Sequence, residues 1–189
     1  MTEAFYDHLA KTRHQIHQHP EVSEEEHETT VFLKGYLKNL GIEPLNYPLK
    51  TGLIAEIGSG HAIIALRADI DALPIREKTG LPYASDNGAM HACGHDFHQT
   101  SLLGAAQLLK EREAELKGTV RLIFQPAEEN FQGAYQKEIP GVFAFIGSNG
   151  EENAPDWHHD DFLVKDEALP VAVNYYVENA LFLLGYFKD

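Results

Sequence analysis

The chain has 189 residues, of which 43% are hydrophobic and 23% are charged, and this suits one globular domain with a core of ordinary size. Fifteen basic side chains against 29 acidic ones give a formal net charge of −14, which repels phosphate backbones and excludes nucleic acid as an expected partner. The sequence has no run of 18 apolar residues, no apolar signal segment at its start and one cysteine, so we expect no membrane partner, no disulfide and a cytoplasmic location.

The N-terminal part of the chain is predicted to form two helices. Residues 3–19 carry apolar side chains on one side, and Pro20 ends the pattern. Ser23 and Glu26 have the spacing of a capping box, which predicts a second helix from Ser23 to about Asn39.

The rest of the chain alternates between predicted strands and helices. We expect strands at 43–49, 53–57, 61–70, 119–124 and 142–146, and helices at 95–116 and 169–187. Residues 71–94 and 147–161 lack periodicity and are expected to be loops; a loop as long as the first is usually functional. The alternation predicts an α/β fold in which a mostly parallel central sheet is covered by helices on both faces.

Three segments with reactive side chains follow predicted strands. They are 69–71 with two aspartates, 128–129 with two glutamates, and 158–159 with two histidines. Ligands of parallel α/β sheets bind beyond the carboxyl ends of the strands. We therefore expect these segments to contribute to one site.

The densest cluster of reactive side chains lies at residues 90–98 (MHACGHDFH). Cys93 and His95 cannot share a helix face, because two positions turn a helix by about 200°. In a loop they can converge on one ion, and Gly94 between them allows a close bend. Sulfur with nitrogen suits zinc or another borderline divalent metal. The alternative is a buried, inert cysteine beside surface histidines.

Two pairs of carboxylates add to this cluster. In the Glu128-Glu129 pair, one side chain can bind a metal while the other accepts a proton from water; the alternative is a solvated acidic pair. Asp69 or Asp71, at the end of a strand, can accept the free N–H of a ligating imidazole. The alternative for these aspartates is a strand-end cap or an ion pair with Arg67.

The remaining histidines divide into two groups. His158 and His159 lie in a predicted loop, where one of them could supply a late metal ligand or both could simply be solvated. The histidines of the first two predicted helices are expected to be mostly structural or surface groups, and they are His14, His17, His19 and His27.

Together these segments resemble the amidohydrolase branch of the co-catalytic zinc aminoacylase/carboxypeptidase superfamily, which includes hippurate hydrolases, N-acyl amino acid deacylases and N-acetyldiaminopimelate deacetylases. The combination of MHACGHD with QPAEE is highly specific. The matching stretches are RHQIHQHPE at 13–21, LRADIDALPI at 66–75, MHACGHDFH at 90–98, FQPAEE at 124–129, PGVFAFIG at 140–147, HHDDF at 158–162 and EALP at 167–170.

The resemblance implies a role for each site residue. It implies metal ligands at Cys93, His95, Glu129 and His158, a general base at Glu128 and a partner of a ligand at Asp69. It also implies two divalent ions in the full-length family, of zinc, manganese, cobalt or nickel. The implied reaction is hydrolysis of the amide bond of an N-acyl amino acid or a small peptide.

The chain departs from the family pattern after QPAEE. Family members are much longer there, with a Gly-Leu-His ligand motif and an inserted lid or dimerisation domain. Here residues from about Phe131 already resemble the returning segment. We therefore expect residues 1–189 to be a single catalytic domain, with the lid domain deleted near residue 130. Such a chain would be a monomer that binds metal weakly and hydrolyses little.

Two rival functions fit parts of the same pattern. One is a metal-binding core or scaffold without catalysis, for which Glu128 would be irrelevant. The other is a cysteine hydrolase that uses Cys93 with His95 or His98, although His95 is expected to be too close in sequence to approach the sulfur well. Chelation of metal would spare activity only in the second case.

Overall fold

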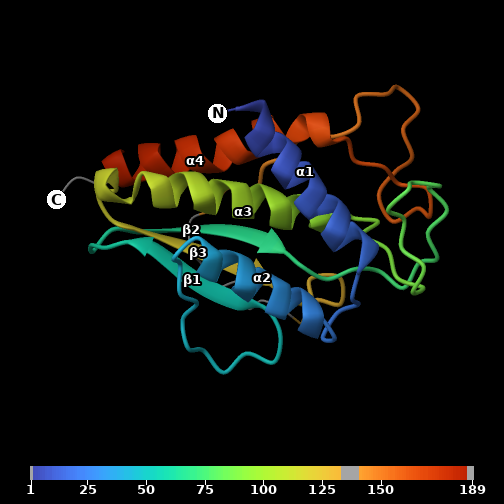
Figure 1. Ribbon diagram of the computed structural model, residues 1–189, viewed down its shortest axis with the longest axis horizontal. Helices are drawn as coiled ribbons and strands as arrows, with labels where there is room; N and C mark the ends of the chain where they lie inside the picture. Colours follow the sequence, from blue (N-terminus) through green and yellow to red (C-terminus); the bar gives the residue numbers. More distant parts are fainter. Residues whose placement is uncertain (1, 133–140, 187–189) are drawn as a thin grey trace.

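The computed structural model describes residues 2–132 and 141–186 of the chain. Four helices and three strands make up its regular structure within these residues (Figure 1). In chain order they are α1 (Glu3–Gln18), α2 (His27–Asn39), β1 (Leu53–Gly58), β2 (Ile63–Asp69), α3 (His95–Glu111), β3 (Thr119–Gln125) and α4 (Leu169–Tyr186), with short 3-10 helices at Glu113–Glu115 and Asp166–Ala168. None of the helices in the described part of the chain is long and apolar enough to cross a membrane.

The sheet has the strand order β1-β3-β2. Strands β2 and β3 are parallel, with Leu66 opposite Leu122, and β1 runs antiparallel to β3, with Ala55 opposite the same Leu122. The predicted α/β class is confirmed. The sheet itself is mixed, because one of its two strand pairs is parallel and the other is antiparallel.

The helices cover one face of this sheet. Burial alternates along β1, and the strand residues that face inward share one core cluster with α2, α3 and α4. Those inward residues are Leu53, Ala55, Ile57, Ile64, Leu66, Ala68, Val120, Leu122 and Phe124. On the other face Ile63 is 52% exposed and Glu56 pairs with Arg121 at 2.6 Å. The expectation of helices on both faces is therefore wrong for the described residues.

The start of α2 differs from the predicted capping box. The helix begins at His27, and Glu26 makes no capping hydrogen bond through its side chain. The hydroxyl of Ser23 instead donates to the Asp71 carboxylate at 2.7 Å, and Glu26 Oε1 accepts the backbone N–H of Ala127 at 2.7 Å. Both side chains are thus drawn away from the helix end, toward the loops that follow β2 and β3.

Two predicted strands do not form. Residues 43–49 contribute only an isolated bridge between Pro44 and Ala55, since prolines cannot donate to a ladder. Residues 142–146 are irregular, and Val142 is 86% exposed. An apolar run forms a strand only where another strand pairs with it, and none does so within the described part of the chain. The other strands and the helices lie where the sequence predicts them, within a few residues at their ends; Phe187, the last residue of the helix predicted at 169–187, lies outside the described residues.

Close packing of α1, α3 and α4 depends on Gly104 of α3. A Cβ built there would lie 2.6 Å from Leu9 Cδ1 and 2.9 Å from Val173 Cγ2, and both of these side chains are fully buried. We expect Gly104→Ala to lower the free energy of unfolding by about 1–3 kcal/mol, because overpacking outweighs the better helix propensity of alanine.

The matched control is Gly35→Ala on α2, where a Cβ meets nothing within 4 Å. This exposed position should gain about 0.5–1 kcal/mol from the propensity alone. Urea unfolding followed by circular dichroism measures both variants. Equal effects of the two substitutions would show that the α1–α3–α4 contact tolerates the extra methyl group.

Candidate metal centre

The candidate site lies beyond the ends of β2 and β3. The segment 70–94 leads from the end of β2 to the start of α3, and it lies at the same end of the molecule as residues 147–165 (Figure 1). The backbone N–H of Lys78 joins the two segments by donating to the carbonyl of Asp160 at 2.7 Å. The two segments thus meet at the edge of the sheet where the sequence analysis predicts the reactive side chains to lie.

Four side chains that the resemblance named as ligands converge there. Cys93, His95 and Glu129 each offer one ligand atom, and these three atoms lie within 4.8 Å of one another. His158 joins them, because its Nε2 lies 3.4 Å from Glu129 Oε2. The backbone N–H of His158 donates to the carbonyl of Ala92 at 2.7 Å, which ties this distant segment to the cysteine loop.

Local backbone geometry explains why Cys93 and His95 can meet. Gly94 between them has a φ of +79°, a left-handed conformation that glycine adopts at little cost. Gly94 also forms the N-cap of α3, so His95 is the first residue of that helix and Cys93 still belongs to the loop. The bend inferred from the sequence is therefore present.

Asp71 orients both His95 and Glu129. The Nδ1–H of His95 donates to the backbone carbonyl of Asp71 at 2.9 Å, and the same nitrogen lies 3.2 Å from Asp71 Oδ1. The other carboxylate oxygen of Asp71 accepts the backbone N–H of Glu129 at 2.9 Å. The Nε2 of His95 is left facing the two glutamates, 3.9 Å from Glu128 Oε2 and 3.9 Å from Glu129 Oε1.

Asp69 has a different position from the one expected for it. The contact with the Nδ1 side of His95 is made by Asp71, whereas Asp69 Oδ1 accepts from Arg67 at 2.5 Å and Oδ2 lies 3.6 Å from His98 Nδ1. The sequence contained both aspartates as candidates. The choice between them depends on where each side chain points at the end of β2, and the motif alone does not contain that information.

The donor set fits a divalent cation. Glu129 Oε1 is buried and has no hydrogen-bond donor among the described residues. A buried carboxylate oxygen without a donor is costly unless a cation neutralises it. Thiol sulfur, imidazole nitrogen and carboxylate oxygen together suit a borderline metal such as zinc.

Two groups in the site have shifted pKa values that bear on chemistry. Burial and the nearby charge of Asp69 raise the pKa of Glu128, whose side chain is about one third exposed. A carboxylate with a raised pKa accepts a proton more readily. Burial also raises the pKa of the Cys93 thiol, although a hydrogen bond with His95 opposes this shift. His95 thus approaches the sulfur, and the expectation that it is too close in sequence to do so is wrong.

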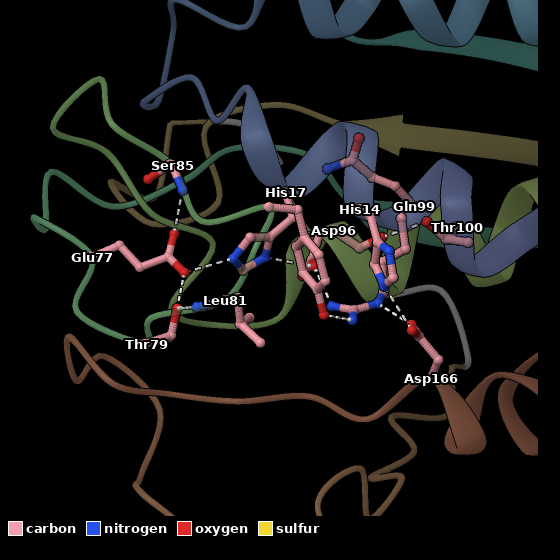
Figure 2. Close-up of polar contacts among 12 residues, drawn as sticks. His14, His17, Glu77, Thr79, Leu81, Ser85, Asp96, Gln99, Thr100 and Asp166 are labelled. Atoms are coloured by element: carbon pink, nitrogen blue, oxygen red, sulfur yellow. Dashed lines mark hydrogen bonds and ion pairs between the residues drawn. The ribbon is translucent and has the colours of Figure 1, made fainter.

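A buried ion network lies directly behind the site. Asp96 follows His95 in α3, and its carboxylate accepts from Arg13 Nη1 at 2.8 Å and from His17 Nδ1 at 2.9 Å. Figure 2 shows His17 between Asp96 and Glu77, the latter at 3.0 Å from Nε2. Burial lowers the pKa of His17, but the hydrogen bonds to the two carboxylates outweigh burial and raise it to about 9. His17 is therefore a charged structural histidine, as expected for this helix.

Fold and site together define an α/β domain with a candidate metal centre at the carboxyl ends of its parallel strands. Residues 65–137 match the peptidase family M20/M25/M40. A solved structure that resembles this chain is described as a member of the same family.

The relatives are named as deacetylases of N-acetylcysteine and as hydrolases of IAA-amino acids. An N-acetyl-L-cysteine deacetylase of Bacillus subtilis is 56% identical over 155 residues, which cover 78% of this chain and 36% of the relative. A second B. subtilis protein, an N-acetylcysteine deacetylase, is 49% identical over 177 residues, or 91% of this chain and 47% of the relative. The IAA-amino acid hydrolase ILR1-like 5 of Arabidopsis thaliana is 48% identical over 77% of this chain and 34% of its own length. The chain therefore spans about a third to a half of the length of these relatives.

Solved structures show the same relationship. The crystal structure of the B. subtilis YXEP protein, described as a dinuclear metal binding peptidase from the M20 family, matches with a TM-score of 0.68 and 55% identity, over 70% of this chain and 38% of that one. A putative aminohydrolase from methicillin-resistant Staphylococcus aureus matches with a TM-score of 0.66 and 39% identity, over 69% of this chain and 36% of that one.

Proposed function

We propose that this chain is the core of a metal-dependent amidohydrolase that cleaves the amide bond of N-acyl amino acids. The observation that carries the proposal is the convergence of Cys93, His95, Glu129 and His158 beside a second carboxylate, Glu128. These four side chains come from three separate segments of the chain. Their meeting is what a shared ion requires, and a merely structural cysteine would not require it.

The four converging side chains are proposed to hold a divalent metal ion, of zinc, manganese, cobalt or nickel. Such an ion supplies Lewis acidity, which polarises an amide carbonyl and makes water more acidic. Asp71 fixes the imidazole of His95 so that Nε2 points into the site. His158 is preferred over its neighbour His159 because its Nε2 faces Glu129.

Glu128 is proposed as the general base. Its Oε2 lies on the same side of His95 as Glu129 Oε1, and each is 3.9 Å from Nε2. Its partial exposure leaves it accessible to water and substrate. In the proposed reaction Glu128 takes a proton from the attacking water and delivers it to the nitrogen of the leaving amine.

The names of the relatives support the substrate class. Two of them are deacetylases of N-acetylcysteine and one is a hydrolase of an acylated amino acid. An N-acyl amino acid is accordingly the first substrate to test, and a small peptide is the second. The cysteine hydrolase is the weaker alternative, because burial raises the pKa of Cys93 and so disfavours a reactive thiolate.

We further infer that the lid domain of the longer relatives is missing near residue 130. The relatives extend well beyond the matched part, and the apolar segment after the proposed join is exposed, with Phe143 at 75% and Phe145 at 77%. Exposed apolar side chains in such number usually mark a surface that is covered in the complete protein. A lid would exclude water and complete substrate contacts, so turnover without it should be slow. A cytoplasmic monomer remains our prediction for this chain.

The test is amine release from N-acetyl-L-cysteine and other N-acetyl amino acids, with zinc, manganese or cobalt added. We expect turnover below about 1 per second that chelation abolishes. Glu128→Gln should reduce it by about 100- to 10,000-fold, the usual contribution of a general base, while metal content stays unchanged.

The control is Glu152→Gln, which alters an exposed carboxylate in the 147–161 loop and should behave like the unmodified chain. Single-turnover conditions with excess protein make slow hydrolysis measurable. Metal binding without any turnover would support the non-catalytic core instead, and activity that survives both chelation and Glu128→Gln would contradict the proposed function.

A further inference from the structure

The turn that carries Glu128 and Glu129 begins with a strained backbone conformation. Ala127 directly precedes the two glutamates and has a φ of +54°, in the left-handed region. A residue with a Cβ adopts this region at a cost in free energy, because the Cβ approaches the following carbonyl oxygen. Such a conformation persists only where the surrounding structure holds it. The contacts of Ala127 therefore decide how the two glutamates are presented.

Glu26, directly before α2, makes the contact that holds Ala127. Its Oε1 accepts the backbone N–H of Ala127 at 2.7 Å, although the two residues are 101 positions apart in the sequence. No donor among the described residues reaches its other oxygen, Oε2. Glu26 is 0% exposed and Ala127 is 3% exposed, so bulk water does not compete for this hydrogen bond.

The backbone on the other side of Glu128 is held as well. The N–H of Glu129 donates to Asp71 Oδ2 at 2.9 Å, and the hydroxyl of Ser23 donates to the same oxygen at 2.7 Å. Ser23 and Glu26, the pair whose spacing predicts a capping box, thus both support this turn. Its backbone is fixed at two N–H groups, one residue before Glu128 and one residue after it.

We propose that Glu26 is a positioning residue, which fixes the backbone of Ala127 and thereby aims the Glu128 carboxylate into the site. This inference rests on the proposed function of Glu128 and adds a residue outside the metal centre to the machinery. A general base must lie within hydrogen-bond reach of the proton that it takes. A misplacement of about 1 Å can lower a rate by about 100-fold.

The role requires an acceptor oxygen at position 26 and no proton transfer by Glu26. Glutamine keeps such an oxygen on a side chain of the same length, whereas methionine keeps the length and offers only a weakly accepting sulfur. A buried backbone N–H without a partner is costly. Glu26→Met should therefore release Ala127 from its strained conformation, and Glu26→Gln should not.

Turnover of N-acetyl-L-cysteine in the presence of zinc tests the proposal. We expect Glu26→Met to lower kcat by about 100-fold. Zinc content should stay unchanged, because Glu129 keeps its own hydrogen bond to Asp71. Glu26→Gln should retain most of the rate. The matched control is Glu25→Met, which changes the neighbouring glutamate with its 63% exposed side chain and should turn over like the unmodified chain.

A second substitution separates positioning from a general loss of stability. Glycine adopts a positive φ at little cost, so Ala127→Gly should restore part of the kcat that Glu26→Met loses. If Glu26→Met does not fold, Glu26→Ala takes its place, since the smaller side chain leaves room for water. Equal rates in the Met and Gln variants of Glu26 would overturn the proposal.

Hydrogen exchange of the Ala127 amide, followed by NMR, reports the contact independently of activity. The amide should be protected in the unmodified chain and in Glu26→Gln, and it should exchange faster in Glu26→Met. Leu122, in the middle of β3, should keep its protection in all three proteins. Unchanged protection of Ala127 in Glu26→Met would overturn the proposal. An unmodified chain without turnover would instead remove the proposed function, and the exchange result would still decide whether Glu26 holds the turn.

Discussion

Cys93→Ala is expected to weaken zinc binding at the proposed metal centre by more than about 100-fold. Substitution of a residue that only hydrogen-bonds to a metal ligand usually lowers metal affinity by about 10- to 100-fold. Cys93 is itself a proposed ligand, so its loss should cost more. Its ligand atom lies within 4.8 Å of those of His95 and Glu129. The sequence has one cysteine, so no other thiol of the chain can replace it. Competition with a chelator of known affinity measures the change in zinc affinity. The Cys93 thiol of the unmodified chain is kept reduced during the measurement.

A neighbouring pair of histidines supplies the matched control for this measurement. His158→Ala should also weaken zinc binding, because Nε2 of His158 lies 3.4 Å from Glu129 Oε2. His159→Ala removes the same group from an exposed position one residue further on, and it should leave zinc affinity within about twofold of the starting chain, as surface changes usually do. Zinc affinity that is insensitive to Cys93→Ala, or equally sensitive at both histidines, would place the ion elsewhere.

The sequence predicts the convergence of the proposed ligands better than it predicts the strands around them. Cys93 and His95 are only two residues apart, and a flexible glycine between them makes their convergence predictable. Glu129 and His158 could be added to the predicted metal site for two reasons. The segments that contain them follow predicted strands, and the family pattern includes both residues. The strand predicted at 142–146 failed for the opposite reason: a strand needs a partner, and partners are not encoded in the run itself.

The supporting contacts around the site were less predictable than the proposed ligands. Ser23 and Glu26 have the spacing of a helix cap, yet their side chains bind Asp71 and Ala127 in the site loops. These two hydrogen bonds join residues that are 48 and 101 positions apart in the sequence. Contacts between such distant residues leave no local sequence pattern. The choice of Asp71 over Asp69 beside His95 has the same origin, since both aspartates fit the motif equally well.

The ion network behind the site should carry much of the stability of this end of the domain. Asp96→Asn is expected to lower the free energy of unfolding by about 3–5 kcal/mol, because it leaves two buried cations without the carboxylate that they share. Arg13 and Asp96 are each 1% exposed, and His17 is 5% exposed. Asparagine keeps the shape of the side chain, so the loss would report on charge.

The comparison variant for Asp96→Asn is Asp160→Asn, which breaks an even shorter ion pair at the surface. Lys78 and Asp160 lie 2.5 Å apart with 68% and 39% exposure, and surface pairs of this kind contribute about 0–1 kcal/mol. Urea unfolding at pH 7 should therefore separate the two variants by at least about 2 kcal/mol. Equal stabilities would mean that Asp166 and Glu77, the other acidic partners of Arg13 and His17, suffice to hold α1 against the first turn of α3. His95 is the first residue of α3. The zinc affinity of the folded Asp96→Asn variant then shows whether the imidazole of His95 needs the ion network to stay in place.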